Sequence, residues 1–207
     1  MKIFAVVNNY LERLGTEPTA GESIFGGGET AWYEMPDSAV THTPNPVFVP
    51  DTDSDVRLFP SIVYKICRLG KGIAPRFAGR YLGEETLGVA MVCAGRLLRL
   101  RRGGMPWTSA VAFDRSCILG NFTAIGTLKE CGPVTLTVGS GEFTYDAGAL
   151  RHTADEAVAM LSAENTLKTG DLIFAALTPD GIPAKTGARL TARLNTPDIT
   201  LIDLNLK

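Results

Sequence analysis

The chain has 207 residues, of which 45% are hydrophobic and 20% are charged, a mix typical of a soluble globular protein. Its formal net charge of -2, without a strongly basic half, argues against nucleic acid or an anionic membrane as the main partner. No apolar run reaches the roughly 18 residues that a transmembrane helix needs. We find no secretory signal at the N-terminus and expect a cytoplasmic protein.

The hydrophobic content is large enough to fill one continuous core. We therefore expect a single domain over residues 1–207, with strand and loops over 1–50 and a β-rich part over 51–207. The four cysteines show no CxxC spacing and lie in or beside apolar runs, so we expect reduced, buried thiols. They are Cys67, Cys93, Cys117 and Cys131.

The first half of the chain predicts strands, loops and two short helices. An apolar run over 2–7 is typical of a buried strand, and the glycine-rich stretch 15–30 predicts a loop. The prolines between 36 and 60 exclude helices and favour short strands joined by turns. The other expected elements are strands over 62–69 and 87–92, one or two helical turns over 75–82, and an amphipathic helix over 94–102 that ends at Gly103-Gly104.

The second half of the chain predicts mostly strands. Gly139-Ser140-Gly141 separates two alternating runs, which indicates a β-hairpin over 134–145. Thr153 and Glu156 form a capping box that begins a helix ending near Ser162. Strands are expected over 171–178, 190–194 and 199–204. The class predicted from these elements is a β-rich α+β fold.

The motifs that could carry chemistry have structural explanations. Asp51, Asp53 and Asp55 alternate as in an EF-hand loop, but that loop would then place Val56 and Ile62 where Gly and Glu are required. A solvated acidic turn is the better interpretation. The arginines at 96, 99, 101 and 102 suit the end of a helix, and the histidines at 42 and 152 belong to no ligand pattern. The residues alone indicate no active site.

Several phrases, taken together and in order, resemble the fumarylacetoacetate hydrolase family across nearly the whole chain. The phrases are Asn9-Tyr10 ("RNY"), Met35-Pro36-Asp37-Ser38-Ala39 ("KPxxA"), Val49-Pro50 ("lP"), Leu69-Gly70-Lys71 ("IGK"), Leu87-Gly88, Pro106-Trp107 with Ala112-Phe113-Asp114-Arg115-Ser116 ("PW…KxFDgS"), and 167–174 with Thr178-Pro179-Asp180-Gly181 ("LxpGDlIfTGTPxG"). The resemblance implies a mixed β-roll or sandwich with a few short helices, commonly a homodimer.

The resemblance also implies a chemistry. Family members act on small 2-oxo or 1,3-dicarbonyl acids with Mg²⁺ or Mn²⁺, which is bound by a Glu-x-Glu pair and a later Asp. The cation polarises the keto and carboxylate oxygens and stabilises an enolate while a carbon–carbon bond breaks or a double bond shifts. A histidine near the N-terminus helps to activate water, and the lysine of "KxFD" steadies negative charge.

This chain departs from the family at each of those positions. The two glutamate positions fall on Phe59 and Ser61, and the aspartate position on Ala90. The histidine position falls on Arg13 and the lysine position on Val111. Residues 56–66 and 87–113 contain no Asp or Glu that a small alignment shift could bring in. We therefore expect no metal ligands, no bound Mg²⁺ or Mn²⁺ and none of the family's catalytic residues.

Three functions remain open at this stage. The first is a protein that keeps the fold but has lost the family's metal-dependent catalysis, and that binds a small carboxylic acid or a partner chain. In such a metal-free pocket the guanidinium of Arg13 could hold a carboxylate, although a surface arginine is the simpler interpretation. The pocket residues that this hypothesis names are Asn9, Tyr10, Arg13, Asp114 and Thr178.

The second function is an active hydrolase, isomerase or decarboxylase on small oxo-acids that uses rearranged residues. Its first candidates would be Glu84, Glu85, Asp114 and Arg13. The third is an interaction module, which predicts an exposed apolar patch and a second chain that binds to it.

Overall fold

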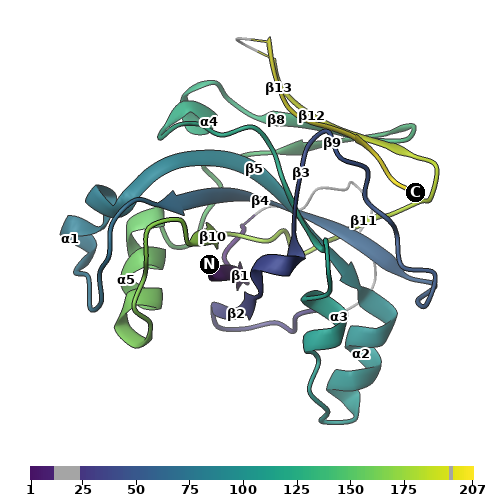
Figure 1. Ribbon diagram of the computed structural model, residues 1–207, viewed down its shortest axis with the longest axis horizontal. Coiled ribbons are helices and arrows are strands. Elements are labelled where there is room, and N and C mark those ends of the chain that lie inside the picture. Colours follow the sequence, from purple (N-terminus) through teal and green to yellow (C-terminus); the bar gives the residue numbers. More distant parts are fainter. Residues whose placement is uncertain (12–23, 196–197) are drawn as a thin grey trace.

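Two long neighbouring strands form the centre of the molecule, as the computed structural model shows (Figure 1). The structure describes residues 1–11, 24–195 and 198–207. Strands β4 (Val56–Ile66) and β5 (Leu82–Cys93) pair antiparallel along almost their full length. Most residues of β4 are buried, because the sheet is covered on both faces, and its sequence is a nearly continuous apolar run.

The larger sheet extends from β4 and β5 in both directions. Its strand order is β2-β1-β10-β4-β5-β6-β3, with β11 paired to β4 and β7 paired to β5. Strands β1 and β10 pair parallel, as do β3 and β6, so the sheet is mixed. The bounds are β1 (Ile3–Val7), β2 (Ala31–Met35), β3 (Val40–His42), β6 (Cys117–Leu119), β7 (Thr123–Ala124), β10 (Leu172–Phe174) and β11 (Ile182–Pro183).

A second, antiparallel sheet lies above the first in Figure 1, in the order β13-β12-β8-β9. Its bounds are β8 (Val134–Val138), β9 (Gly141–Tyr145), β12 (Arg189–Asn195) and β13 (Asp198–Asn205). In β8 buried and half-buried residues alternate, which places one face against the core. Gly139, at φ +61°, supplies the left-handed turn between β8 and β9.

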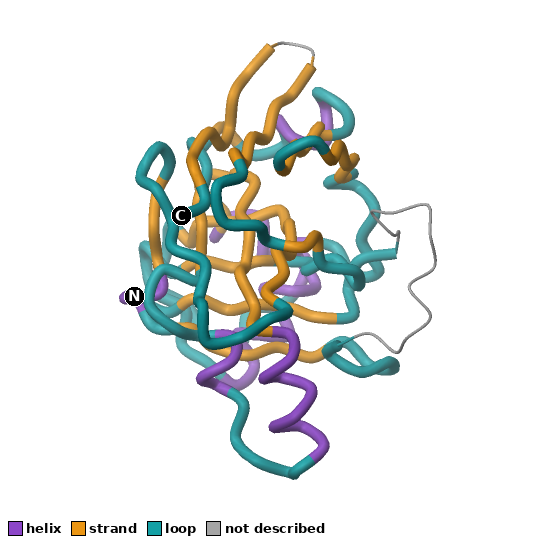
Figure 2. Tube along the Cα trace, turned by 90° about the vertical axis from the view of Figure 1, so that its right-hand side faces the viewer, coloured by secondary structure: helices purple, strands orange, loops and turns teal. Residues whose placement is uncertain are grey.

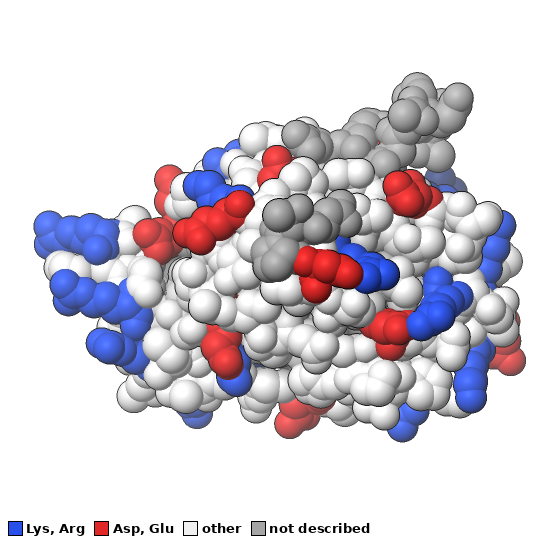
Figure 3. All heavy atoms as spheres, turned by 90° about the horizontal axis from the view of Figure 1, so that it is seen from above, with Lys and Arg blue, Asp and Glu red and all other residues white. Residues whose placement is uncertain are grey.

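Short helices surround the sheets, and Figure 2 shows them at the periphery of the strands. The bounds are α1 (Pro75–Ala78), α2 (Ala94–Arg102), α3 (Thr108–Val111), α4 (Thr127–Glu130) and α5 (Ala154–Glu164), with 3₁₀ turns η1 (Asp37–Ala39) and η2 (Gly79–Tyr81). Within the described ranges, none of these helices has the length and apolar character that crossing a bilayer requires. Figure 3 shows acidic and basic side chains mixed over one face, with basic ones gathered at the end that carries α1.

Elements with local sequence signals match the predictions, and the β-rich α+β class is confirmed. The helix over 94–102 and the hairpin over 134–145 are present, and the backbone N–H of Thr153 donates to Glu156 in a complete capping box. The strand predicted over 171–178 is shorter, because only Leu172–Phe174 is regular. The helices α3 and α4 were not predicted.

Two further expectations were wrong in detail. The strand predicted over 62–69 overlaps β4 only as far as Ile66, and β4 begins earlier, at Val56. The strand predicted over 87–92 is part of the longer β5. Pro60 lies inside β4. On the side of β4 to which the nitrogen of Pro60 points, β10 and β11 pair with other residues of β4, so the missing N–H of Pro60 costs no hydrogen bond between strands. All four cysteines are free, as expected, but Cys67 is exposed and Cys131 is only partly buried.

Asp53, in the acidic turn before β4, caps the N-terminus of α2, although the two are far apart in the sequence. The carboxylate of Asp53 accepts the backbone N–H of Arg96 at 2.6 Å and that of Asp55 at 3.0 Å. A carboxylate at the first turn satisfies an otherwise unpaired N–H and is favoured by the helix dipole. This arrangement gives the turn a structural role.

We expect Asp53→Ala to lower the free energy of unfolding by about 1–2 kcal/mol, because the first turn of α2 loses its cap. Urea denaturation followed by circular dichroism measures the change. Asp51→Ala is the matched control, since Asp51 is exposed and has no hydrogen bond among the described residues. Equal stability of the two variants would contradict the capping role.

Candidate functional site

The positions where the family would hold its metal lie together on one face of the larger sheet. Phe59 and Ala90 are Cα partners across β4 and β5, and Ser61 pairs with Gly88. Because side chains alternate along a strand, Phe59 and Ser61 share this face with Ala90. All three side chains are fully buried. The register therefore brings these three positions together.

Aromatic rings occupy this face beside Phe59. The rings of Phe25 and Phe59 meet edge to face at 5.2 Å, and those of Tyr33 and Trp107 at 5.5 Å. Phe25 also stacks on Tyr33 at 6.1 Å. Gly181 packs against the ring of Phe59, and a Cβ there would clash with it. We call Phe25, Tyr33, Phe59 and Trp107 the aromatic cluster.

Strand β6, which pairs with β5 on the side away from β4, adds a side chain to the same face. Cys117 of β6 is the Cα partner of Ala90, so its side chain lies on the face of Phe59. Complete burial raises the pKa of the Cys117 thiol well above its ordinary value. The thiol is therefore neutral, and a neutral sulfur is a poor ligand for a hard cation such as Mg²⁺.

The hydroxyl of Tyr33 is buried and has no hydrogen-bond partner among the described residues. Burial raises its pKa well above the ordinary value, and the nearby Cys117 adds to the shift. Tyr33 also lines a cavity of about 230 Å³ together with Trp107 and Val111, the residue at the family's lysine position. A buried hydroxyl without a partner is rare in native structures, and Tyr33 carries one.

The oxygen of Ser61 is already used by the protein. Its hydroxyl accepts the N–H of Ala176 at 3.0 Å and donates to the carbonyl of Ile62 at 2.9 Å. Tyr145 joins the same two segments, since its hydroxyl accepts the N–H of Ile62 at 2.8 Å. Ser61 therefore holds the irregular chain after β10 against β4 and offers little to an ion.

The residues named for a small-acid pocket lie apart from the aromatic cluster or are committed elsewhere. Both polar atoms of Asn9 bond to the backbone, with Nδ2 donating to Ala175 at 2.8 Å and Oδ1 accepting from His152 at 2.7 Å. The ring of Tyr10 stacks on Tyr145 at 4.8 Å. These contacts join the exit of β1 to the start of α5.

The other named pocket residues have different environments. Thr178 is buried, and its hydroxyl donates to the carbonyl of Asp180 at 3.0 Å. Asp114 is exposed. Arg13 lies outside the described residues, so its role in an acid pocket stays a prediction.

The two glutamates proposed as relocated ligands do not reach Ala90. Glu84 lies on the same face but six residues along β5, about 20 Å away for an extended strand. It forms an ion pair with Lys65 at 2.8 Å. Glu85 lies on the opposite face. Among the residues with described positions, no three His, Cys, Asp or Glu side chains gather as a metal site.

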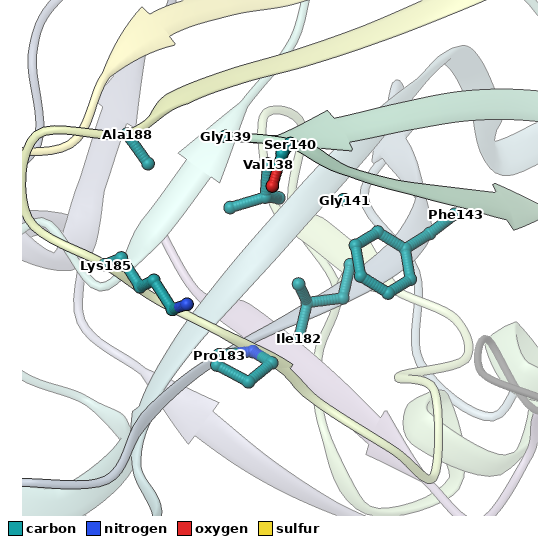
Figure 4. A pocket seen from close by; sticks show the side chains of 9 residues that line it. All are labelled: Val138, Gly139, Ser140, Gly141, Phe143, Ile182, Pro183, Lys185 and Ala188. Carbon is teal, nitrogen blue, oxygen red and sulfur yellow. The ribbon is translucent and has the colours of Figure 1, made fainter. Parts of the chain in front are cut away.

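A separate pocket of about 270 Å³ lies under the β8–β9 hairpin (Figure 4). Figure 4 shows Phe143 and Ile182 side by side, with Lys185 extending along the pocket. Ile182 pairs with Leu58, whose side chain lies on the face opposite to Phe59. This pocket is therefore distinct from the aromatic cluster.

No protein-family model matches the chain. A mitochondrial oxaloacetate decarboxylase of Dictyostelium discoideum is 25% identical over 193 residues, which are 90% of this chain and 85% of that protein. An oxaloacetate tautomerase of Escherichia coli (strain K12) is 29% identical over 107 residues, or 49% of this chain and 48% of that protein.

Solved structures match along the whole chain. A fumarylpyruvate hydrolase from Pseudomonas aeruginosa, in complex with Mn²⁺ and pyruvate, has a TM-score of 0.81 at 21% identity, covering 100% of this chain and 90% of that one. A Yersinia pestis CO92 protein, provisionally assigned to the fumarylacetoacetate hydrolase family, has a TM-score of 0.83 at 19% identity, covering 100% and 92%. This chain has the fumarylacetoacetate hydrolase fold.

Sequence reasoning located Phe59 and Ala90 in this fold but missed their surroundings. The missed residues are Phe25, Tyr33 and Cys117. Tyr33 stands two residues before Met35-Pro36, the start of the "KPxxA" phrase, and Trp107 belongs to the "PW" phrase. These two phrases were the sequence signals near the aromatic cluster. Which side chains meet there depends on tertiary packing.

We expect Phe59→Ala to lower the free energy of unfolding by about 3–5 kcal/mol, because a fully buried ring is lost from the aromatic cluster. Thermal and urea unfolding measure the loss. Phe48→Ala is the control, since Phe48 is 59% exposed and its removal leaves no internal cavity. A loss below about 1 kcal/mol would show that the cluster is loosely packed.

Proposed function

We propose that this chain is a fumarylacetoacetate hydrolase-fold binding protein that has lost the divalent-metal site and the metal-dependent catalysis. In this proposal it binds a small carboxylic acid or a partner chain as a homodimer. The observation that carries the proposal is the buried ring of Phe59 opposite Ala90, at the positions where the family would place carboxylates. The relatives named for oxaloacetate suggest the class of acid.

The donor set on this face does not fit a hard cation. Mg²⁺ and Mn²⁺ require several anionic or carbonyl oxygens in a nearly octahedral arrangement. Phe59 and Ala90 supply none, and the single oxygen of Ser61 is bonded to the backbone. We therefore derive no chemical step that passes through a metal at this face.

The remaining cavity beside Tyr33 suits a small molecule. Its volume of about 230 Å³ is enough for an acid of a few carbons, with Trp107 and Val111 as apolar walls. The exposed carboxylate of Glu34 also lines this cavity and opposes a fully anionic ligand. The neutral Tyr33 hydroxyl would donate a hydrogen bond to a carbonyl or carboxylate oxygen, and the buried donor would thereby gain a partner.

We expect Mn²⁺ to leave the thermal unfolding midpoint unchanged, and to add nothing to a shift that oxalate alone produces. A ligand that binds only the native state at 100 times its dissociation constant would stabilise it by about 2.7 kcal/mol, so binding would be visible. The triple variant Phe59→Glu/Ser61→Glu/Ala90→Asp restores the carboxylates and should gain a Mn²⁺-dependent shift. A metal-dependent shift in the unchanged protein would overturn the proposal.

Metal-free proton transfer on a 2-oxo acid is a second candidate function. It is favoured by one observation, the unpartnered Tyr33 hydroxyl at the cavity. Keto–enol interconversion moves one proton from carbon to the carbonyl oxygen and needs no net reactant. The carboxylate of Glu34, which lines the same cavity, would take the proton from carbon and return it to oxygen, while the neutral Tyr33 hydroxyl would donate a hydrogen bond to the enolate oxygen. The E. coli relative is named a tautomerase.

Under this second function, Tyr33→Phe should slow enol formation from oxaloacetate by about 10²-fold, measured by enol absorbance in excess EDTA. Tyr81→Phe is the control, because Tyr81 lies outside this cavity. If the unchanged protein shows no rate above the buffer, the second function is excluded and the binding role remains.

A further inference from the structure

The opposite face of the sheet carries a buried carboxylate with one unpaired oxygen. Glu85 is only 2% exposed, and its Oε1 accepts the backbone N–H of Leu128 at 2.7 Å. Its Cα partner across the strands is Tyr64, which is 8% exposed. Within the part of the chain that the structure describes, neither Oε2 of Glu85 nor the Tyr64 hydroxyl has a hydrogen-bond partner.

Both side chains line a cavity of about 420 Å³ between α4 and α5. Asp155, in the first turn of α5, adds a second carboxylate to the lining. Apolar side chains complete the walls. These are Leu82, Ile125 and Leu150. The cavity thus combines acidic groups with apolar surface, and it is of the size that small-molecule sites have.

The charge in this cavity is negative. Burial raises the pKa of Tyr64 well above its ordinary value, and the neighbouring carboxylates of Glu85 and Asp155 raise it further, so the hydroxyl stays neutral. Lys129 also lines the cavity, but its side chain is exposed and forms no ion pair within the described residues. Oε2 of Glu85 accepts no hydrogen bond from the described residues and is open to the cavity, where a cation would be attracted to it.

We propose that this cavity binds a small primary amine with a short apolar body. An ammonium group has three N–H donors and no acceptor, and the cavity offers three acceptor groups: Glu85 Oε2, the Asp155 carboxylate and the Tyr64 hydroxyl oxygen. The apolar body would lie against Leu82 and Ile125. The site is separate from the aromatic cluster and does not depend on its function.

Other ligands fit the same groups less well. A carboxylate ligand would be repelled by Glu85 and Asp155. A divalent metal would need more ligands than these two carboxylates, and no group of three metal-binding side chains is found among the described residues. The hairpin pocket of Figure 4 has the opposite character, because its one charged side chain is Lys185.

Isothermal titration with benzylamine tests the proposal, with benzyl alcohol and benzoate as neutral and anionic analogues of the same shape. We expect benzylamine to bind about tenfold or more tightly than benzyl alcohol, and benzoate not to bind. Equal affinity for benzylamine and benzyl alcohol would overturn the proposal, because the apolar walls alone would then explain binding.

Variants of the lining residues locate the site. Glu85→Gln keeps an acceptor for the Leu128 N–H but removes the charge, and should weaken benzylamine binding about tenfold. Lys129→Met removes a like charge and should strengthen binding, while Lys185→Ala in the hairpin pocket should change nothing. If Glu85→Gln does not fold, Asp155→Asn provides the same test. Unchanged binding in a folded Glu85→Gln or Asp155→Asn variant would place the amine elsewhere.

Discussion

The antiparallel register of β4 and β5 decides which side chains can act together. Pairing Phe59 with Ala90 fixes the pairing of Tyr64 with Glu85 five residues further along the same strands. Since successive side chains point to opposite faces, the first pair and the second pair lie on different sides of the sheet. A shift of one residue would exchange the two faces, placing Glu85 on the aromatic side and burying a charge among rings.

The face that carries Phe59 is held together by the packing of aromatic rings. Grouped carboxylates repel one another unless a cation neutralises them, whereas buried rings stabilise the native state without any ligand. Edge-to-face contacts at 5.2 and 5.5 Å add to this stabilisation. The cost that remains is the unsatisfied hydroxyl of Tyr33. The packing of these rings therefore stabilises this face of the sheet.

The parts of this structure that the sequence could predict are those with local causes. The capping box at Thr153 and the glycines after Arg102 act within a few residues, so α5 and α2 were placed correctly. The presence of Pro60 inside β4 could not be foreseen, because it depends on a gap between β10 and β11. Family phrases located Phe59, but the rings around it come from distant segments whose meeting only the folded chain defines.

Glu85 shows why a structural role and a binding role can share one residue. One carboxylate oxygen holds the N–H of Leu128 and so anchors α4 to β5. The other oxygen accepts no hydrogen bond from the described residues and is available at the cavity surface. An amide in its place would keep the anchor and lose the charge. The anchor therefore explains why an acceptor stands at this position, whereas the proposed amine would use the charge and the second oxygen.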